Sequence, residues 1–224
     1  MSTEAVTLSQ IIQVTDIAWA SLTSSIKAKM LWSDPATSRR AQLMRFEPGA
    51  TLPMHRHVGD ELLYVIEGSV SDEFSTVAAG SVGYRPEGCV HSVTSKNGAT
   101  TFAIISGSIE PAIEIGTAPP SRTIVLSDMP WTELLPGLHA KLFWSDPATK
   151  RRALLGRFDP GAKLPRHKHI GDELLFMIEG SNFDESGELR TGNLSYFANG
   201  CVHEVVSKNG HTAMAFVTGE SEVL

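Results

Sequence analysis

The chain has 224 residues, of which 42% are hydrophobic and 20% are charged, and its formal net charge is -6. This length suits one large or two small domains with packed cores. The acidic balance argues against a nucleic-acid-binding surface, which is usually basic, and no apolar run approaches the roughly 20 residues that a membrane-spanning helix needs.

From the N-terminus onward, the pattern predicts short strands. The first residues lack the basic segment and apolar core of a signal peptide, and only Cys89 and Cys201 are present, so we expect a cytoplasmic protein with reduced thiols. A short helix is expected at 15–22. It is followed by β-rich runs at 41–48, 61–68, 81–86, 91–95 and 100–107, which end at Gly, Pro, Asn or Asp. Short strands at close spacing predict an all-β sandwich or barrel.

The second half of the chain repeats the first. Residues 28–68 match 140–180 without a gap, at an offset of 112 residues, and each copy spans about 100 residues, a normal domain size. The small residues, Gly and paired Pro of 116–123 suit a connector. The sequence therefore predicts two domains, 1–118 and 119–224, the second with a short helix at 127–135.

Each repeat carries residues that bind metals. Alternate residues of a strand share one face, so His55 and His57 project together. Gly59 can bend the chain so that Glu61 folds back toward them, and His91 would join from the opposite sheet. The predicted ligands are three histidines and one glutamate in each repeat: His55, His57, Glu61 and His91, then His167, His169, Glu173 and His203.

Neutral imidazoles and a carboxylate suit several first-row metals, and an octahedral ion would keep two positions open. We expect one divalent ion per repeat, with zinc or iron favoured over nickel or manganese, in a structural or a reactive role. Surface histidine pairs and a metal-free polar network are the alternatives. Cys89 and Cys201 precede His91 and His203 by two residues. Each cysteine is a candidate to contact the metal ligands, and the alternative is a buried packing role.

His139 and His211 have no repeat partner and are assigned to structure or surface. No catalytic residue can be named from the sequence.

The ligand spacing resembles the two cupin motifs. Gly49, His55, His57, Glu61 and Gly68 match the first motif, and Gly80, Pro86, Gly88 and His91 match the second. The other half matches through Gly161, His167, His169, Glu173, Gly180, Gly192, Gly200 and His203, and departs at Ala198, where the motif has proline. This resemblance implies a bicupin of two tandem double-stranded β-helix (jelly-roll-like) barrels.

A narrower resemblance is to the cupin of ChrR-type anti-sigma factors, which the pairs Asp72-Glu73 and Asp184-Glu185 also fit. It implies zinc binding and a metal-dependent role in oxidative-stress sensing or regulation. The helical zinc-binding domain of those factors is not recognisable here, which argues against sigma-factor binding. The alternatives are a non-haem Fe(II) dioxygenase that cleaves a diketone or hydroxy-ketone, and a metal-stabilised binding module. The expected partners are a small molecule or O2 at the metal, with a homodimer left open.

Overall fold

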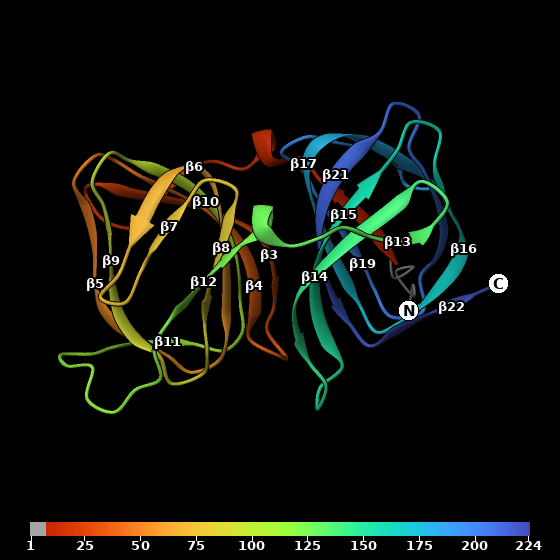
Figure 1. The fold of residues 1–224 in the computed structure, drawn as a ribbon. Helices are drawn as coiled ribbons and strands as arrows, with labels where there is room; N and C mark the ends of the chain where they lie inside the picture. The colour runs from red at the N-terminus through yellow and green to blue at the C-terminus, as the bar shows by residue number, and fades with distance from the viewer. Residues whose placement is uncertain (1–7) are drawn as a thin grey trace, which may run out of the picture. The chain divides into compact units, whose positions relative to one another are not determined.

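The computed structural model describes residues 8–224, and nearly all of its regular structure is β-strand (Figure 1). The chain divides into two compact units, one of Thr15–Asp128 and one of Met129–Leu224 together with residues 8–14. In each unit eleven strands form one curled sheet. The predicted fold class, two tandem double-stranded β-helix barrels, is confirmed.

The first unit is built on the path β11-β5-β9-β6-β10-β4-β3-β2, and β6 also pairs with β7 and β8. Its strands are β2 (Ala20–Ser21), β3 (Ile26–Asp34), β4 (Arg39–Phe46), β5 (Ala50–His57), β6 (Glu61–Ser71), β7 (Thr76–Ala78), β8 (Ser81–Arg85), β9 (Val90–Ser95), β10 (Ala99–Ile105), β11 (Ile109–Pro111) and β12 (Arg122–Val125).

The second unit follows the equivalent path β13-β14-β15-β21-β17-β20-β16-β22, and β17 also pairs with β18 and β19. Its strands are β1 (Ser9–Ile12), β13 (Thr132–Leu135), β14 (Leu138–Asp146), β15 (Arg151–Phe158), β16 (Lys163–Ile170), β17 (Glu173–Asp184), β18 (Gly187–Arg190), β19 (Leu194–Phe197), β20 (Val202–Val206), β21 (His211–Thr218) and β22 (Glu220–Val223).

The first strand of each repeat belongs to the unit that holds the other repeat. Strand β1 pairs with β19, and β12, which lies about 112 residues later, pairs with β8. The boundaries of the compact units therefore do not coincide with the boundaries of the sequence repeats. The division near residue 118 concerns the repeats and stays a prediction.

The barrel interiors are apolar because alternate strand residues point inward. The core of the first unit contains Ile26, Phe46, Leu63, Val65 and Ile105, each no more than 2% exposed. Gly68 ends the inner segment of β6 at φ 75°, and a Cβ atom there would lie 2.1 Å from the carbonyl oxygen of Gly98. Only glycine fits a left-handed position with so close an approach of backbone.

The two predicted helices are wrong. Residues 127–135 begin within a single 3-10 turn, η2 (Leu126–Asp128), and continue into strand β13. Residues 15–22 likewise begin within the 3-10 turn η1 (Val14–Asp16) and continue into strand β2. Strand β13 pairs with β14 across a tight turn at Gly137. Pairing at a sheet edge gives the backbone N–H and C=O groups of such a short segment hydrogen-bond partners. A helix of only two turns would be marginally stable by itself. Among residues 8–224, no helix is long and apolar enough to cross a membrane.

Candidate metal centres

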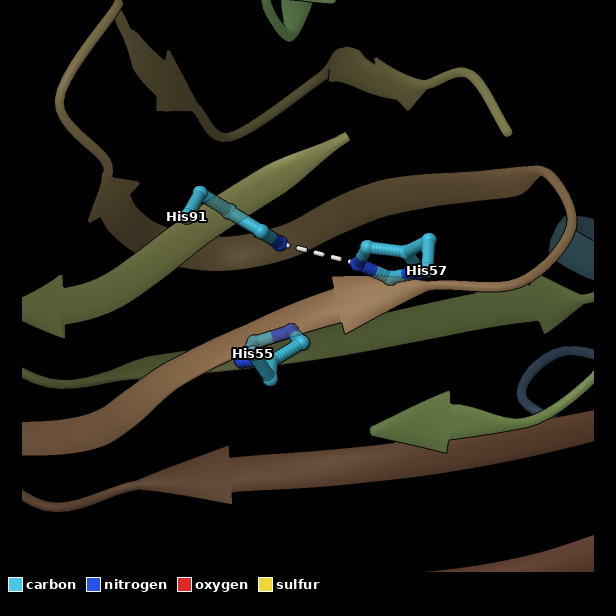
Figure 2. Close-up of side chains that lie close together, drawn as sticks. All are labelled: His55, His57 and His91. Carbon is cyan, nitrogen blue, oxygen red and sulfur yellow. Dashed lines mark hydrogen bonds between the residues drawn. The ribbon is translucent and has the colours of Figure 1, made fainter. Parts of the chain in front are cut away.

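Three imidazole rings meet inside the first unit. Figure 2 shows His55 and His57 on the same strand, β5, with His91 facing them from the neighbouring strand β9. His57 Nε2 lies 2.9 Å from His91 Nε2, and one ring nitrogen from each of the three lies within 4.8 Å of the others. All three are buried. The two-residue spacing and the antiparallel β5–β9 pairing thus bring together the three predicted histidines.

The second unit repeats this cluster with His167, His169 and His203. The distance from His169 Nε2 to His203 Nε2 is again 2.9 Å, and all three rings are buried. The six histidines with repeat partners are therefore the six that the structure gathers.

Neighbouring oxygen atoms fix which ring nitrogen is free. His55 Nδ1 lies 2.8 Å from the carbonyl oxygen of Pro53, and the second unit repeats this contact at 2.9 Å. A carbonyl only accepts, so each Nδ1–H donates and each Nε2 keeps its lone pair. His203 Nδ1 lies 3.1 Å from Asp184 Oδ2, which has the same effect. In the first unit His91 Nδ1 is 3.5 Å from Asp72 Oδ2, a looser contact.

Burial keeps four of the rings, His55, His57, His167 and His169, neutral at pH 7. It lowers the pKa of His57 to about 4 and that of His169 to about 3, and it lowers those of His55 and His167 as well. Neutral imidazole is the form that binds a metal. These four rings can therefore act as ligands at neutral pH without first losing a proton.

The geometry of each cluster fits a metal ion. Two Nε2 atoms at 2.9 Å repel each other unless a proton or a cation lies between them. With metal–nitrogen bonds of about 2.1 Å, adjacent ligands lie roughly 3.0 Å apart on an octahedral ion and roughly 3.4 Å apart on a tetrahedral one. At 2.9 Å, the two Nε2 atoms of each cluster are close enough to bind one ion together.

The two glutamates lie beside the clusters but are not part of them. Glu61 Oε2 is 3.8 Å from His57 Nε2, and Glu173 Oε2 is 3.8 Å from His169 Nδ1. Neither belongs to a group whose ligand atoms all lie within 4.8 Å of one another. Their role as fourth ligands stays a prediction.

The environments of the two glutamates differ because of one position in the repeat. Arg85 is completely buried, and its guanidinium lies 3.6 Å from Glu61 and 3.5 Å from Asp72. The equivalent residue of the second unit is Phe197, whose ring stacks on His169 at 5.5 Å. The first centre therefore has a buried cation where the second has an aromatic wall.

This difference changes the acidity of the carboxyl groups. Burial opposes the ionisation of Glu61, but His57 and Arg85 outweigh it and hold its pKa below the ordinary value. Burial alone dominates at Glu173 and raises its pKa to about 7. Burial would raise the pKa of Asp72, but hydrogen bonds from the His91 and Ser121 side chains and from two backbone N–H groups hold it well below its usual range.

A cavity reaches each centre. In the first unit it measures about 430 Å³ and is lined by His55, Glu61, Arg40, Gln42 and otherwise apolar side chains. In the second it measures about 250 Å³ and is lined by His167, His203, Glu173, Arg152 and mostly apolar residues. A small molecule could thus approach the histidines through a largely apolar space.

The cysteine thiols are buried next to the centres, and burial raises the pKa of Cys89 to about 11 and that of Cys201 above its usual range. The cysteine main chains contact the ligand strands directly. The His57 backbone N–H donates to the Cys89 carbonyl oxygen, and the His169 backbone N–H donates to the Cys201 carbonyl oxygen.

Sequence reasoning missed the contacts of Asp72 and Asp184 with the distal histidines. The two aspartates occupy equivalent positions of the repeats, 112 residues apart, and this recurrence could have identified them. Sequence reasoning also missed Arg85, which has no counterpart in the other repeat.

Comparisons with known proteins agree with this architecture. The family described as the ChrR Cupin-like domain matches the chain twice, at residues 8–109 and 121–221. A "putative dioxygenase" from Nostoc punctiforme has a similar structure, with a TM-score of 0.83, 12% identity, and coverage of 97% of this chain and 85% of that one. An oxalate decarboxylase mutant from Bacillus subtilis gives a TM-score of 0.72 at 15% identity, covering 100% and 80%.

No curated protein matches the chain. At these identities the structural likeness shows the fold alone. The two family matches cover most of the sequence and coincide with the two histidine clusters. The chain therefore belongs to the ChrR cupin-like family, as a bicupin with two copies of the domain.

Proposed function

We propose that each cupin binds one divalent transition-metal ion through its three histidines, with Glu61 or Glu173 as the fourth protein ligand. The convergence and the burial of the three rings in each unit support this proposal. Zinc and iron remain the favoured ions, and nickel and manganese are alternatives.

We further propose that the metal centres act on a small, largely apolar organic molecule, as a metal-dependent dioxygenase acting on a diketone or hydroxy-ketone would. The single observation that carries this choice is the cavity that leads to the histidines in each barrel. A bound ion would supply a Lewis acid and, if redox-active, electrons for O2. The chain's own residues would orient the ligand and exclude water.

The residues around the second centre have distinct tasks in this proposal. Asp184 holds the His203 ring in the tautomer that directs Nε2 at the ion. Phe197 keeps water away from one face of the rings. The Glu173 carboxyl, whose pKa burial raises to about 7 in the metal-free protein, would give up its proton when it binds the ion as the fourth ligand.

A regulatory role in oxidative stress is the second candidate, and the ChrR family match favours it. Such sensing would act through the metal centre. The thiols are poor candidates, because a buried cysteine with a raised pKa forms little of the reactive thiolate.

Metal analysis tests the first part of the proposal. Purified protein should contain two ions per chain, His57→Ala one ion, and His57→Ala with His169→Ala none. His139→Ala is the matched control, because His139 lies outside both clusters and contacts Asp159. Metal content that is unchanged in the double variant contradicts the proposal.

An oxygen electrode tests the second part. Iron-loaded protein should consume O2 with a panel of diketones and hydroxy-ketones, and the double histidine variant should not. Absence of turnover across the panel, combined with a metal-dependent change of conformation under peroxide or singlet oxygen, would favour the regulatory role.

A further inference from the structure

Two polar side chains line neighbouring parts of the cavity of the second unit, among mostly apolar walls, because His211 lies opposite Gly180 in the β21–β17 pairing, two residues from Asn182. Asn182 and His211 line it together with His167 and His203, and each of the two is only 5% exposed. The equivalent residues of the first repeat are Val70 and Ala99. The polar pair is thus a property of one barrel and is not required by the fold.

The hydrogen bonds around His211 set its tautomer. Burial lowers its pKa to about 4, so the ring is neutral at pH 7 and carries one N–H. Ser207 Oγ donates to the carbonyl oxygen of Ser181 at 3.2 Å. Its lone pairs therefore remain to accept from His211 Nδ1–H, 2.8 Å away. His211 Nε2 is left as a bare acceptor, and Phe158 stacks on the ring at 4.3 Å and holds it in place.

Two polar groups in this part of the cavity lack protein partners. Among residues 8–224, neither His211 Nε2 nor the Asn182 carboxamide makes a hydrogen bond. Polar atoms that line a cavity are satisfied by water or by a ligand that occupies it. A group that fills this part should donate to His211 Nε2 and bond to the carboxamide. A hydroxyl does both, because it is a donor and an acceptor.

The backbone leaves room for such a group. Gly156 lines the cavity, and the equivalent residue of the first repeat is Met44, which is buried. Likewise Ala213 replaces Thr101. The smaller side chains are consistent with a cavity whose lining continues from the histidine cluster to Asn182 and His211.

We propose that Asn182 and His211 recognise a hydroxyl group on a small, largely apolar ligand whose other end lies at His167, His169 and His203. The assignment of that other end rests on the proposed function, whereas recognition of the hydroxyl does not need a metal. The inferred ligand class is therefore a hydroxylated apolar ketone, and the C-terminal cupin is the one that selects it.

A matched pair of probes tests this inference. Binding of para-hydroxyphenylacetone and of phenylacetone, which differ only in the hydroxyl, is measured by calorimetry on the full chain, with and without bound metal. Wild-type protein should prefer the hydroxylated probe at least tenfold, because the analogue leaves both polar groups unpaired. This preference should persist without metal.

The double variant Asn182→Val, His211→Ala installs the residues of the first repeat and should bind both probes about equally. His139→Ala should keep the wild-type preference. Equal binding of the two probes to wild-type protein overturns the inference, as does a preference that survives in the double variant or no binding of either probe at millimolar concentration. If the preference holds but metal never strengthens binding, only the proposed function fails.

Nuclear magnetic resonance of the histidine ring nitrogens provides a second measurement if the double variant does not fold. In wild-type protein His211 should show the tautomer with the proton on Nδ1. Its Nε2 resonance should shift when para-hydroxyphenylacetone is added and remain unchanged with phenylacetone. The opposite tautomer, or no shift, overturns the inference.

Discussion

Arg85→Met should destabilise the metal-free first unit by about 3 kcal/mol. The substitution keeps an apolar stem but removes a buried cation that lies 3.6 Å from Glu61 and 3.5 Å from Asp72. At an effective dielectric constant near 20, each contact is worth about 4–5 kcal/mol before desolvation is subtracted. Removing one partner of a buried ion pair costs roughly 3–5 kcal/mol in measured cases, because the other charge stays behind.

Hydrogen exchange read by mass spectrometry suits this test, because it reports each unit separately. A loss of about 3 kcal/mol corresponds to exchange that is on the order of a hundredfold faster in protected amides of β6 and β8. Peptides from β17 and β19 should not change. Adding zinc should recover part of the loss, because the ion replaces the guanidinium as the positive charge beside Glu61.

Arg45→Met is the control for this prediction. Arg45 is exposed and lies over the Trp19 ring at 4.6 Å, so its loss should cost no more than about 1 kcal/mol. Equal effects of the two substitutions, or a cost below 1 kcal/mol for Arg85→Met, would refute the view that Arg85 compensates two buried carboxylates.

Three further changes test other parts of the structure. Ser121→Ala removes a 2.6 Å hydrogen bond from the Ser121 hydroxyl to the Asp72 carboxylate and should cost about 2 kcal/mol in urea unfolding. Gly171→Ala should cost about 3 kcal/mol or more, because its Cβ atom would lie 1.5 Å from the Thr218 carbonyl oxygen at φ 123°. Glu173→Gln should alter the pH dependence of the metal-free protein. The folded-state pKa of Glu173, about 7, exceeds the ordinary 4.5, so its contribution to stability is complete below pH 4.5 and is lost as pH rises through 7. The free-energy difference between wild type and variant should therefore fall by about 3 kcal/mol across that range, measured by urea unfolding at a series of pH values.

Each of these three changes has a matched control. Ser127→Ala removes an exposed hydroxyl bonded to Asp128, and it should change stability by less than about 0.5 kcal/mol. Gly192→Ala, at φ 82° with open space around it, should cost only about 1–2 kcal/mol. Glu61→Gln should show the opposite pH trend to Glu173→Gln, because the pKa of Glu61 is lowered. Parallel pH profiles for the two glutamine variants would contradict the assigned environments.

The sequence by itself determined the fold class, the duplication and the two sets of histidines. Strand signals are local, and the period of two in β-strands places His55 and His57 on one face without any knowledge of the rest of the chain. The gapless repeat, at an offset of 112 residues, then transfers each conclusion to His167 and His169. His91 and His203 were also found, since the motif spacing identified them even though no local pattern shows where they fold.

Tertiary structure decided everything that depends on contacts between distant strands. The assignment of β1 and β12 to opposite units follows from edge pairing, which hydrophobic periodicity does not encode. The sequence shows that Arg85 and Phe197 differ at equivalent positions, but only the structure shows that Arg85 contacts buried carboxylates and that Phe197 stacks on a histidine ring. The sequence assigned His211 to structure or surface, and only the fold shows that it lines a cavity with its Nε2 unpaired, because burial and hydrogen bonding depend on packing.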